Sequence, residues 1–191
     1  MMPHLKRFRI LPLLLALLMA LPACGKEKEL YRAQFFELFD TVSSLVGYDD
    51  SAEAFQARAE AVKADLEEYH KLYDFYEHHD GYFNLYDINQ KAGQGPVKAD
   101  ERILDLLDFS KSLYERSGGK MNIAMGSVLK IWHDHRTAGI AVPEKASLPD
   151  KKELEEAARH CDPDNLIIDR QAGTVELKDP EMLLDVGAVA K

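Results

Sequence analysis

The stretch Glu181–Lys191, "EMLLDVGAVAK", contains the pattern from which the fold prediction starts. The apolar residues of 182–186 predict a buried strand, and Gly187 with the small residues after it predicts a tight turn into a helix. Where a strand passes into a helix, the N–H groups of the helix start and Lys191 can meet a phosphate, while Asp185 can orient a ribose or a base. Many strand ends share this pattern, so the rest of the chain has to decide.

The preceding sequence predicts a domain that contains both helices and strands. Apolar residues at spacings of three and four, bounded by Ser, Asp, Gly or Pro, predict helices at 52–78, 100–119, 127–136 and 150–160. Mixed aromatic and β-branched residues predict one bent strand or a hairpin over 30–50, and two short strands around a turn over 165–178. The segment 80–100 is predicted to be a loop. These elements indicate an α+β fold with a mixed sheet and long helices.

The N-terminus has the pattern of a bacterial lipoprotein signal. Three cations precede the apolar run Ile10–Leu21, which is too short to cross a bilayer comfortably. The following "LPAC" resembles a lipobox, cut before a Cys that then carries lipid. We therefore expect a signal peptide at 1–23, lipidation at Cys24, a tether over 24–29 and a folded domain at 30–191. The protein would be anchored to the cell membrane by lipid and face the periplasm or the cell exterior.

Composition excludes some classes of protein. The formal net charge is −9, and loss of the three signal-peptide cations would make it −12, which disfavours nucleic acid and anionic membrane surfaces as partners. Besides Cys24 the chain has only Cys161, so no structural disulfide is expected. Cys161 follows a predicted helix, and we interpret it as a packed or partly exposed thiol rather than a nucleophile.

The seven histidines do not form a known metal motif. His78 and His79 are adjacent on a predicted helix and would point in different directions, and His133 and His135 lie on another predicted helix. HExxH and CxxC are absent from the sequence, so we predict surface or packing roles and no zinc site. GxSxG, GxGxxG and the Walker loop are also absent.

A second stretch, "SGGKMNIAMGSVLKIWHDHR" (117–136), places small residues on a connector before a Trp-bearing helix. Small side chains let the backbone approach a ligand closely, or let two helices cross tightly, and the pattern leaves both open.

Four motifs resemble one family, the ApbE-type FAD:protein FMN transferases. They are "FDT" (39–41), "NLYDIN" (84–89), the stretch at 117–136 and "LLDVGAVAK" (183–191). The resemblance implies FAD as substrate and Mg²⁺ as cofactor. It also implies transfer of FMN to a Thr or Ser hydroxyl of an extracytoplasmic flavoprotein, with release of AMP. The residues that it implies for FAD contact are Phe39, Tyr76, Asn122, Ile123, Ala124, Asp185 and Lys191. It implies that the backbone carbonyl of Ala188 binds the metal, and it identifies no catalytic side chain.

The resemblance also implies that the C-terminal part of the domain is missing. In the family, an Asp and a Thr nearer the C-terminus complete the metal site, so we expect a fragment or a natural truncation with little transfer activity of its own. Two other functions stay open: a lipid-anchored flavin-binding protein that is not an enzyme, and a pyrophosphatase that splits FAD into FMN and AMP. A lipoprotein with a purely structural role is a further possibility.

Overall fold

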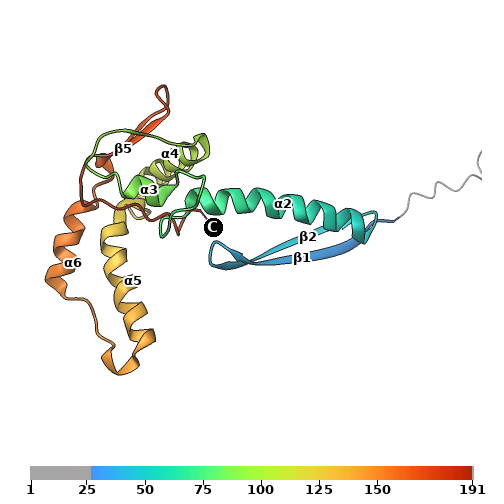
Figure 1. Ribbon diagram of the computed structural model, residues 1–191, viewed down its shortest axis with the longest axis horizontal. Helices are drawn as coiled ribbons and strands as arrows, with labels where there is room; N and C mark the ends of the chain where they lie inside the picture. The colour runs from blue at the N-terminus through green and yellow to red at the C-terminus, as the bar shows by residue number, and fades with distance from the viewer. Residues whose placement is uncertain (1–26, 191) are drawn as a thin grey trace, which may run out of the picture. The chain divides into compact units, whose positions relative to one another are not determined.

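The computed structural model describes residues 27–190, and their contacts divide them into two compact units. The smaller unit contains residues 27–33 and Ser44–Ala59, and the larger unit contains Gln34–Ser43 and residues 60–190. The described residues begin with two strands, end with two strands and contain mainly helices between them (Figure 1). They are β1 (Glu29–Leu38), β2 (Thr41–Asp49), α2 (Ala52–Tyr73), α3 (Leu85–Asn89), β3 (Val97–Lys98), α4 (Glu101–Arg116), η1 (Ile123–Met125), α5 (Gly126–Ala141), η2 (Pro143–Lys145), α6 (Lys151–Ala157), η3 (Ala158–His160), η4 (Pro163–Asn165), β4 (Leu166–Asp169) and β5 (Thr174–Leu177). The predicted mixture of helices and sheets is confirmed. Among these residues no helix is both long and apolar enough to cross a membrane.

The first two strands form a hairpin, which decides between the two predictions for 30–50. β1 and β2 pair in a two-stranded sheet, and the turn residues Phe39 and Asp40 have φ of 54° and 50°. Two successive positive φ angles are typical of the two-residue turn that matches the twist of a hairpin. Within the smaller unit, the Tyr31 ring stacks on Phe55 at 5.6 Å between ring centroids.

The helix predicted at 52–78 is too long at its C-terminal end, because α2 ends at Tyr73. Asp74 causes this ending: its Oδ1 accepts the N–H groups of Tyr76 and Glu77, at 2.8 and 3.2 Å. An aspartate that bonds its own following backbone in this way offers the chain a turn in place of the next helical bonds. Tyr76 therefore lies on an irregular segment.

The larger unit contains the main hydrophobic core. Helix α4 begins at the N-cap Asp100, whose side chain accepts the Arg102 N–H, and its residues Ile103 and Leu107 are fully buried. This helix contacts β4, one of the two edge strands of an antiparallel sheet with the order β3-β5-β4. The predicted helices at 100–119, 127–136 and 150–160 and the predicted strand pair at 165–178 are thus all confirmed.

A short helix, α3, lies inside the segment that was predicted to be a loop. Asn84 and Asp87 form a capping box at its start, and the Asn84 amide also donates to the carbonyls of Lys71 and Glu77. The side chains of Leu85 and Ile88 are fully buried. Five helical residues are too few for a periodic pattern, so the capping box was the only signal of this helix in the sequence.

The strand predicted at 182–186 is not formed. The segment is extended and its alternate side chains are buried, but its backbone bonds are made with a connector and a side chain instead of with a strand. The Gly126 N–H donates to the Leu183 carbonyl at 3.1 Å, and the Asp185 N–H donates to the Ile123 carbonyl at 2.8 Å. Asn89 bonds both the N–H and the carbonyl of Leu184, at 2.8 and 3.0 Å.

Candidate functional site

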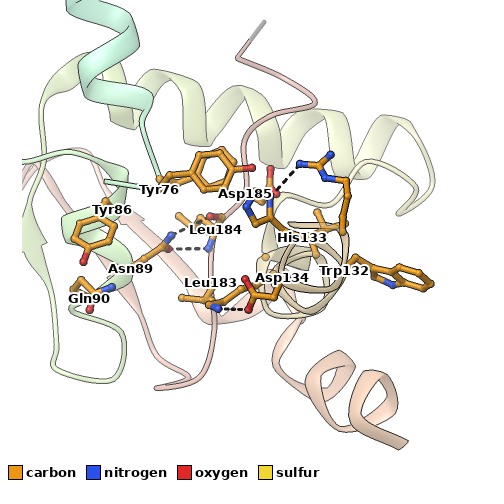
Figure 2. Close-up of a pocket in the computed structure, with 15 residues that line it drawn as sticks. Tyr76, Tyr86, Asn89, Gln90, Trp132, His133, Asp134, Leu183, Leu184 and Asp185 are labelled. Atoms are coloured by element: carbon orange, nitrogen blue, oxygen red, sulfur yellow. Dashed lines mark hydrogen bonds and ion pairs between the residues drawn. The ribbon is translucent and has the colours of Figure 1, made fainter. Parts of the chain in front are cut away.

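Two adjoining cavities in the larger unit form the candidate site (Figure 2). Their volumes are about 690 and 460 Å³. Both volumes fall in the range of small-molecule and cofactor sites. Five residues line both cavities, and they come from the segment after α2, from α5 and from the extended segment before the C-terminus: Phe75, Tyr76, His133, Arg136 and Asp185.

Asp185 is the predicted site residue that the structure fixes most firmly. Its backbone N–H is bonded to Ile123, and its carboxylate Oδ1 accepts the Gly187 N–H at 2.9 Å. The chain then makes one helical turn, in which the Ala190 N–H donates to the Val186 carbonyl at 2.9 Å. These contacts leave the second carboxylate oxygen of Asp185 without a backbone bond to a described residue, on the wall that the two cavities share.

Tyr76 belongs to an aromatic wall. Its ring lies 4.2 Å from the Phe75 ring and 5.3 Å from the His133 imidazole, measured between centroids. The Tyr76 side chain is 53% exposed, so one part of it faces the cavities (Figure 2). Partial burial and the nearby Asp185 charge raise the pKa of the Tyr76 phenol, while Arg136 lowers it. Tyr76 is therefore a neutral hydrogen-bonding and stacking group near pH 7.

One face of α5 supplies cavity residues that were not predicted from the sequence to contact a ligand. Leu129, Trp132, His133 and Arg136 recur at helical spacing and all line the larger cavity. His133 was predicted to have a surface or packing role, yet its Nδ1 lies 3.3 Å from Nη2 of Arg136, beside Asp185. The available signal in the sequence was a helical stripe that combines large apolar or aromatic residues with a cation, since a stripe in the core would have lacked the cation.

Phe39 lies at the hairpin turn and lines the smaller cavity. Its N–H donates to Nδ1 of His70 at 3.3 Å, and its ring meets the His70 ring edge-on at 5.5 Å. Phe39 and Asp185 thus line the same cavity, as their predicted shared role requires. The predictions for Lys191 and for lipidation at Cys24 lie outside the described residues.

Asn122, Ile123 and Ala124 form the connector before α5, but they do not line either cavity. The Asn122 side chain accepts the Ala124 N–H and donates to the Cys161 carbonyl, at 2.9 and 2.8 Å. Ile123 and Ala124 are buried in the core. FAD contact by these three residues stays a prediction. What the geometry adds is that Ile123 positions Asp185 through its carbonyl.

The connector is close-packed against the chain itself at Gly126. A Cβ atom at this position would lie 2.4 Å from the Leu183 carbonyl oxygen. The small residue thus permits the backbones of Gly126 and Leu183 to approach each other closely. From the sequence, either a close ligand or a tight helix crossing was expected here.

Ala188 is the predicted metal ligand, and its chemistry fits a hard cation. The residue is exposed, and among the described residues its carbonyl accepts no backbone hydrogen bond. A free carbonyl oxygen is a normal ligand for Mg²⁺ or Ca²⁺.

Two interpretations of cysteine and histidine can be compared with the structure. Cys161 is buried, its thiol contacts the Ala157 carbonyl at 3.5 Å, and burial raises its pKa, which agrees with a packed thiol. The helical placement of His78 and His79 is wrong because α2 ends before them. His78 instead bonds Asp87, and His79 bonds Asp74.

The fold and the cavities define an α+β domain with an aromatic-lined site beside an Asp-Val-Gly turn. The chain belongs to the ApbE family, whose model matches residues 39–191. It is 34% identical over 111 residues to an FAD:protein FMN transferase of Treponema pallidum, an alignment that covers 54% of this chain and 28% of that protein. It is 29% identical over 109 residues to an FAD:protein FMN transferase of Klebsiella pneumoniae, covering 55% of this chain and 31% of that protein.

Solved structures show the same fold. The ApbE protein of Thermotoga maritima matches with a TM-score of 0.68 and 21% identity, over 85% of this chain and 48% of that one. The flavin transferase ApbE of Vibrio cholerae matches with a TM-score of 0.66 and 15% identity, over 86% of this chain and 50% of that one. The chain thus spans about half the length of these structures, and its alignments cover less than a third of the two curated relatives.

Proposed function

We propose that the protein takes part in FAD:protein FMN transfer, in which the FMN part of FAD passes to a Thr or Ser hydroxyl of an acceptor flavoprotein and AMP leaves. In this reaction the hydroxyl oxygen bonds the phosphorus of FMN and the phosphorus–oxygen bond to AMP breaks. The observation that carries the proposal is the position of Asp185 on the wall shared by two adjoining cavities, held by the connector that the family resemblance had singled out. Membership of the ApbE family and similarity to two FAD:protein FMN transferases support it.

The cavity residues offer a distinct contact for each part of FAD. Phe75, Tyr76 and His133 provide flat surfaces for an aromatic ring. Arg136 lines both cavities and provides a guanidinium group for charge-assisted hydrogen bonds to the pyrophosphate oxygens. The Asp185 carboxylate accepts hydrogen bonds from a ribose or a base. The three contacts would orient the dinucleotide so that its pyrophosphate is open to attack in line.

Mg²⁺ is part of the same proposal. Ala188 would contribute its carbonyl oxygen as one ligand. When bound, the cation would neutralise charge on the pyrophosphate oxygens. The Asp185 carboxylate accepts the Gly187 N–H and so stabilises the turn that carries the Ala188 carbonyl.

The test uses the full-length protein, FAD, Mg²⁺ and the acceptor flavoprotein of a characterised family member. Covalent FMN is read as flavin fluorescence of the denatured acceptor and as its mass increase, and AMP is measured in the same sample. We expect AMP and covalent FMN in equal amounts. We expect both to be lost when the metal is chelated or when the acceptor Thr is replaced by Ala.

Arg136→Ala provides the residue-level test, because it removes the proposed pyrophosphate contact. We expect roughly a tenfold or greater loss of transfer, since hydrogen bonds to charged groups contribute about 1.5–3 kcal/mol. Arg159→Ala is the matched control, because Arg159 is an exposed cation paired with Glu156 on α6. AMP and free FMN formed without acceptor would identify a pyrophosphatase instead. FAD binding with no cleavage would identify a flavin-binding protein.

Lipid anchoring at Cys24 is proposed with it, and places the reaction at the outer side of the cytoplasmic membrane or beyond. The support is the signal sequence: a basic start, an apolar run and Leu-Pro-Ala-Cys. Wild-type protein should fractionate with membranes and carry lipid on its N-terminal peptide. Two results would contradict the proposal: a wild-type N-terminal peptide without lipid, or a Cys24→Ser protein that fractionates with membranes as the wild type does.

A further inference from the structure

Three potential metal ligands meet at the C-terminal end of α2. His70, Asp74 and His79 each offer one ligand atom, and these atoms all lie within 4.8 Å of one another. His70 is in the last turn of the helix, and Asp74 follows four residues later, so the two side chains lie on the same side. The turn that the Asp74 side chain stabilises reverses the chain, so that the His79 side chain lies next to His70 and Asp74.

Backbone hydrogen bonds fix the orientation of the Asp74 carboxylate. Its Oδ1 accepts the N–H groups of Tyr76 and Glu77, while its Oδ2 lies 2.9 Å from Nε2 of His79. The Asp74 side chain is 10% exposed and that of His79 is 21% exposed. A carboxylate held by two N–H groups, with its other oxygen toward an imidazole, matches the way in which neighbouring hydrogen bonds orient metal ligands.

His70 connects the cluster to the cavity. Its ring lies 5.8 Å from the His79 ring, and its Nδ1 accepts the Phe39 N–H. A neutral imidazole that binds a metal through Nε2 carries its proton on Nδ1, and one that binds through Nδ1 has no lone pair left there. In both cases a bound metal removes the acceptor of the Phe39 N–H. The cluster is thus coupled to the hairpin turn that lines the smaller cavity.

We propose that His70, Asp74 and His79 bind a divalent transition-metal ion of the Zn²⁺ type. Two imidazoles and one carboxylate are a ligand set for Zn²⁺ with at least one coordination position open, whereas Mg²⁺ prefers oxygen ligands alone. The site is therefore chemically different from the carbonyl of Ala188. It reverses the prediction from sequence that the histidines bind no zinc, since the spacing His-x3-Asp-x4-His becomes a cluster only where the helix ends at Tyr73.

The experiment titrates metal-free, full-length protein, freed of any affinity tag, with Zn²⁺ by calorimetry and with Co²⁺ by visible absorption. We expect one equivalent of either ion to bind, with the intense ligand-field bands of a low-coordinate Co²⁺ site, and no displacement by excess Mg²⁺. His79→Ala and Asp74→Asn should each lower Zn²⁺ affinity by roughly tenfold or more, because loss of even an outer-shell contact has an effect of that size.

His78→Ala is the matched control, because His78 directly precedes the proposed ligand His79 in the sequence but bonds Asp87. It should bind Zn²⁺ as the wild type does. Asp74→Asn keeps an oxygen acceptor for the Tyr76 and Glu77 N–H groups, so it preserves the turn. It removes the charge and replaces the proposed ligand oxygen Oδ2 by an NH2 group. Circular dichroism and the melting temperature check that each variant is folded.

A readout on the wild type makes the result independent of the variants. Nuclear magnetic resonance spectra should show Zn²⁺-dependent shifts of the His70 and His79 rings and of the Phe39 amide. Absence of saturable Zn²⁺ binding by folded wild-type protein would overturn the proposal. So would binding that leaves these three signals unchanged, or equal affinities for the wild type and the two folded ligand variants.

Discussion

Asp185 connects three features of the larger unit at the scale of a single residue. Its N–H is bonded to the connector, its Oδ1 to the Gly187 N–H, and its carboxylate lies on the wall of both cavities. The hydrogen bond to Gly187 is local and fixes the side-chain orientation, in the manner of an Asx turn. Charge and orientation at this position can therefore be separated by the choice of substitution.

Asp185→Asn should keep the turn and remove the charge, whereas Asp185→Ala should remove both. We expect both variants to weaken FAD binding, by roughly tenfold for Asn and up to about a hundredfold for Ala, because the alanine also leaves the Gly187 N–H without its partner. Titration of FAD against each variant, followed by flavin fluorescence, measures the difference. Unchanged FAD affinity in Asp185→Ala would remove Asp185 from the binding site.

The site residues that sequence predicted and those that it missed differ in where their signal lies. Asp185 stood beside a turn in a short motif, so a local pattern identified it, whereas Tyr76 ended a predicted helix and was implied by the family resemblance. Arg136 and His133 sit on a regular helix, and only the fold brings that helix face to Asp185 (Figure 2). Conversely, the small side chain of Ala124 was compatible with ligand contact, but the tertiary packing buries it.

At the scale of elements, the extended segment 182–186 depends on the connector instead of on a sheet. Its hydrogen bonds to Ile123 and Gly126 form only because the two backbones come close, and a Cβ at Gly126 would lie 2.4 Å from the Leu183 oxygen. The obstacle is a backbone atom, so no side-chain rotation relieves it.

Gly126→Ala should therefore destabilise the protein by about 1–3 kcal/mol, the usual effect of overpacking, although alanine favours the helix start. It should also weaken FAD binding, since the displaced segment carries Asp185. Chemical denaturation measures the first effect. Gly47→Ala is the control, because its new Cβ would meet only the Phe55 ring at 3.7 Å, and an equal loss of stability in both variants would contradict the explanation.

A charged pair joins η3 to the turn before the same segment. Nδ1 of His160 lies 2.9 Å from the Asp179 carboxylate, and this bond raises the pKa of His160 against a smaller opposing effect of desolvation. For Asp179, desolvation acts upward, but the Glu181 N–H and His160 together lower the pKa of the carboxyl. Folding therefore favours the protonated imidazole and the ionised carboxylate.

The pair should stabilise the fold only where both charges are present. The contribution of His160 is complete below the ordinary histidine pKa of 6.5 and is lost as pH rises through the higher folded value. That of Asp179 is complete above its ordinary pKa of 3.8 and is lost as pH falls. The free energy of unfolding of the wild type should exceed that of His160→Gln by up to about 1 kcal/mol between the ordinary pKa values of the two groups, 3.8 and 6.5, and by less at pH 8. Melting curves across pH measure this. The pH dependence should become smaller in an Asp179→Asn background, where Glu181, 3.5 Å from Nε2 of His160, is the remaining carboxylate partner.

The elements that sequence predicted well are those in which local and tertiary signals agree. α4 has an N-cap, a periodic apolar face and a glycine at its end, and the structure uses all three. The end of α2 was misplaced because the apolar pattern continues to Tyr76, whereas the Asp74 side chain ends the helix. The strand at 182–186 was wrong because alternation shows which side chains are buried but not which backbone supplies the hydrogen bonds.

At the scale of the whole molecule, the two units are supported by cores of different size. The larger unit has the continuous apolar core around α3, α4 and the three-stranded sheet. In the smaller unit, Phe55, Ala59 and the carboxylate of Asp49, paired with Arg58 at 2.7 Å, are the buried groups among the residues described there. Regions with few buried contacts open at a lower free energy than the global unfolding of a protein.

Amide hydrogen exchange should therefore divide along the boundary between the units. We expect the strand amides of 44–49 to exchange at least about tenfold faster than those of α4 at 103–107, a difference of ~1.4 kcal/mol in opening free energy. Phe55→Ala should accelerate exchange at 44–49, because it removes the ring that stacks on Tyr31, and should leave α4 unchanged. Equal protection of the two segments, or equal acceleration in the variant, would mean that the units open as one and that hairpin and core share a single cooperative unfolding.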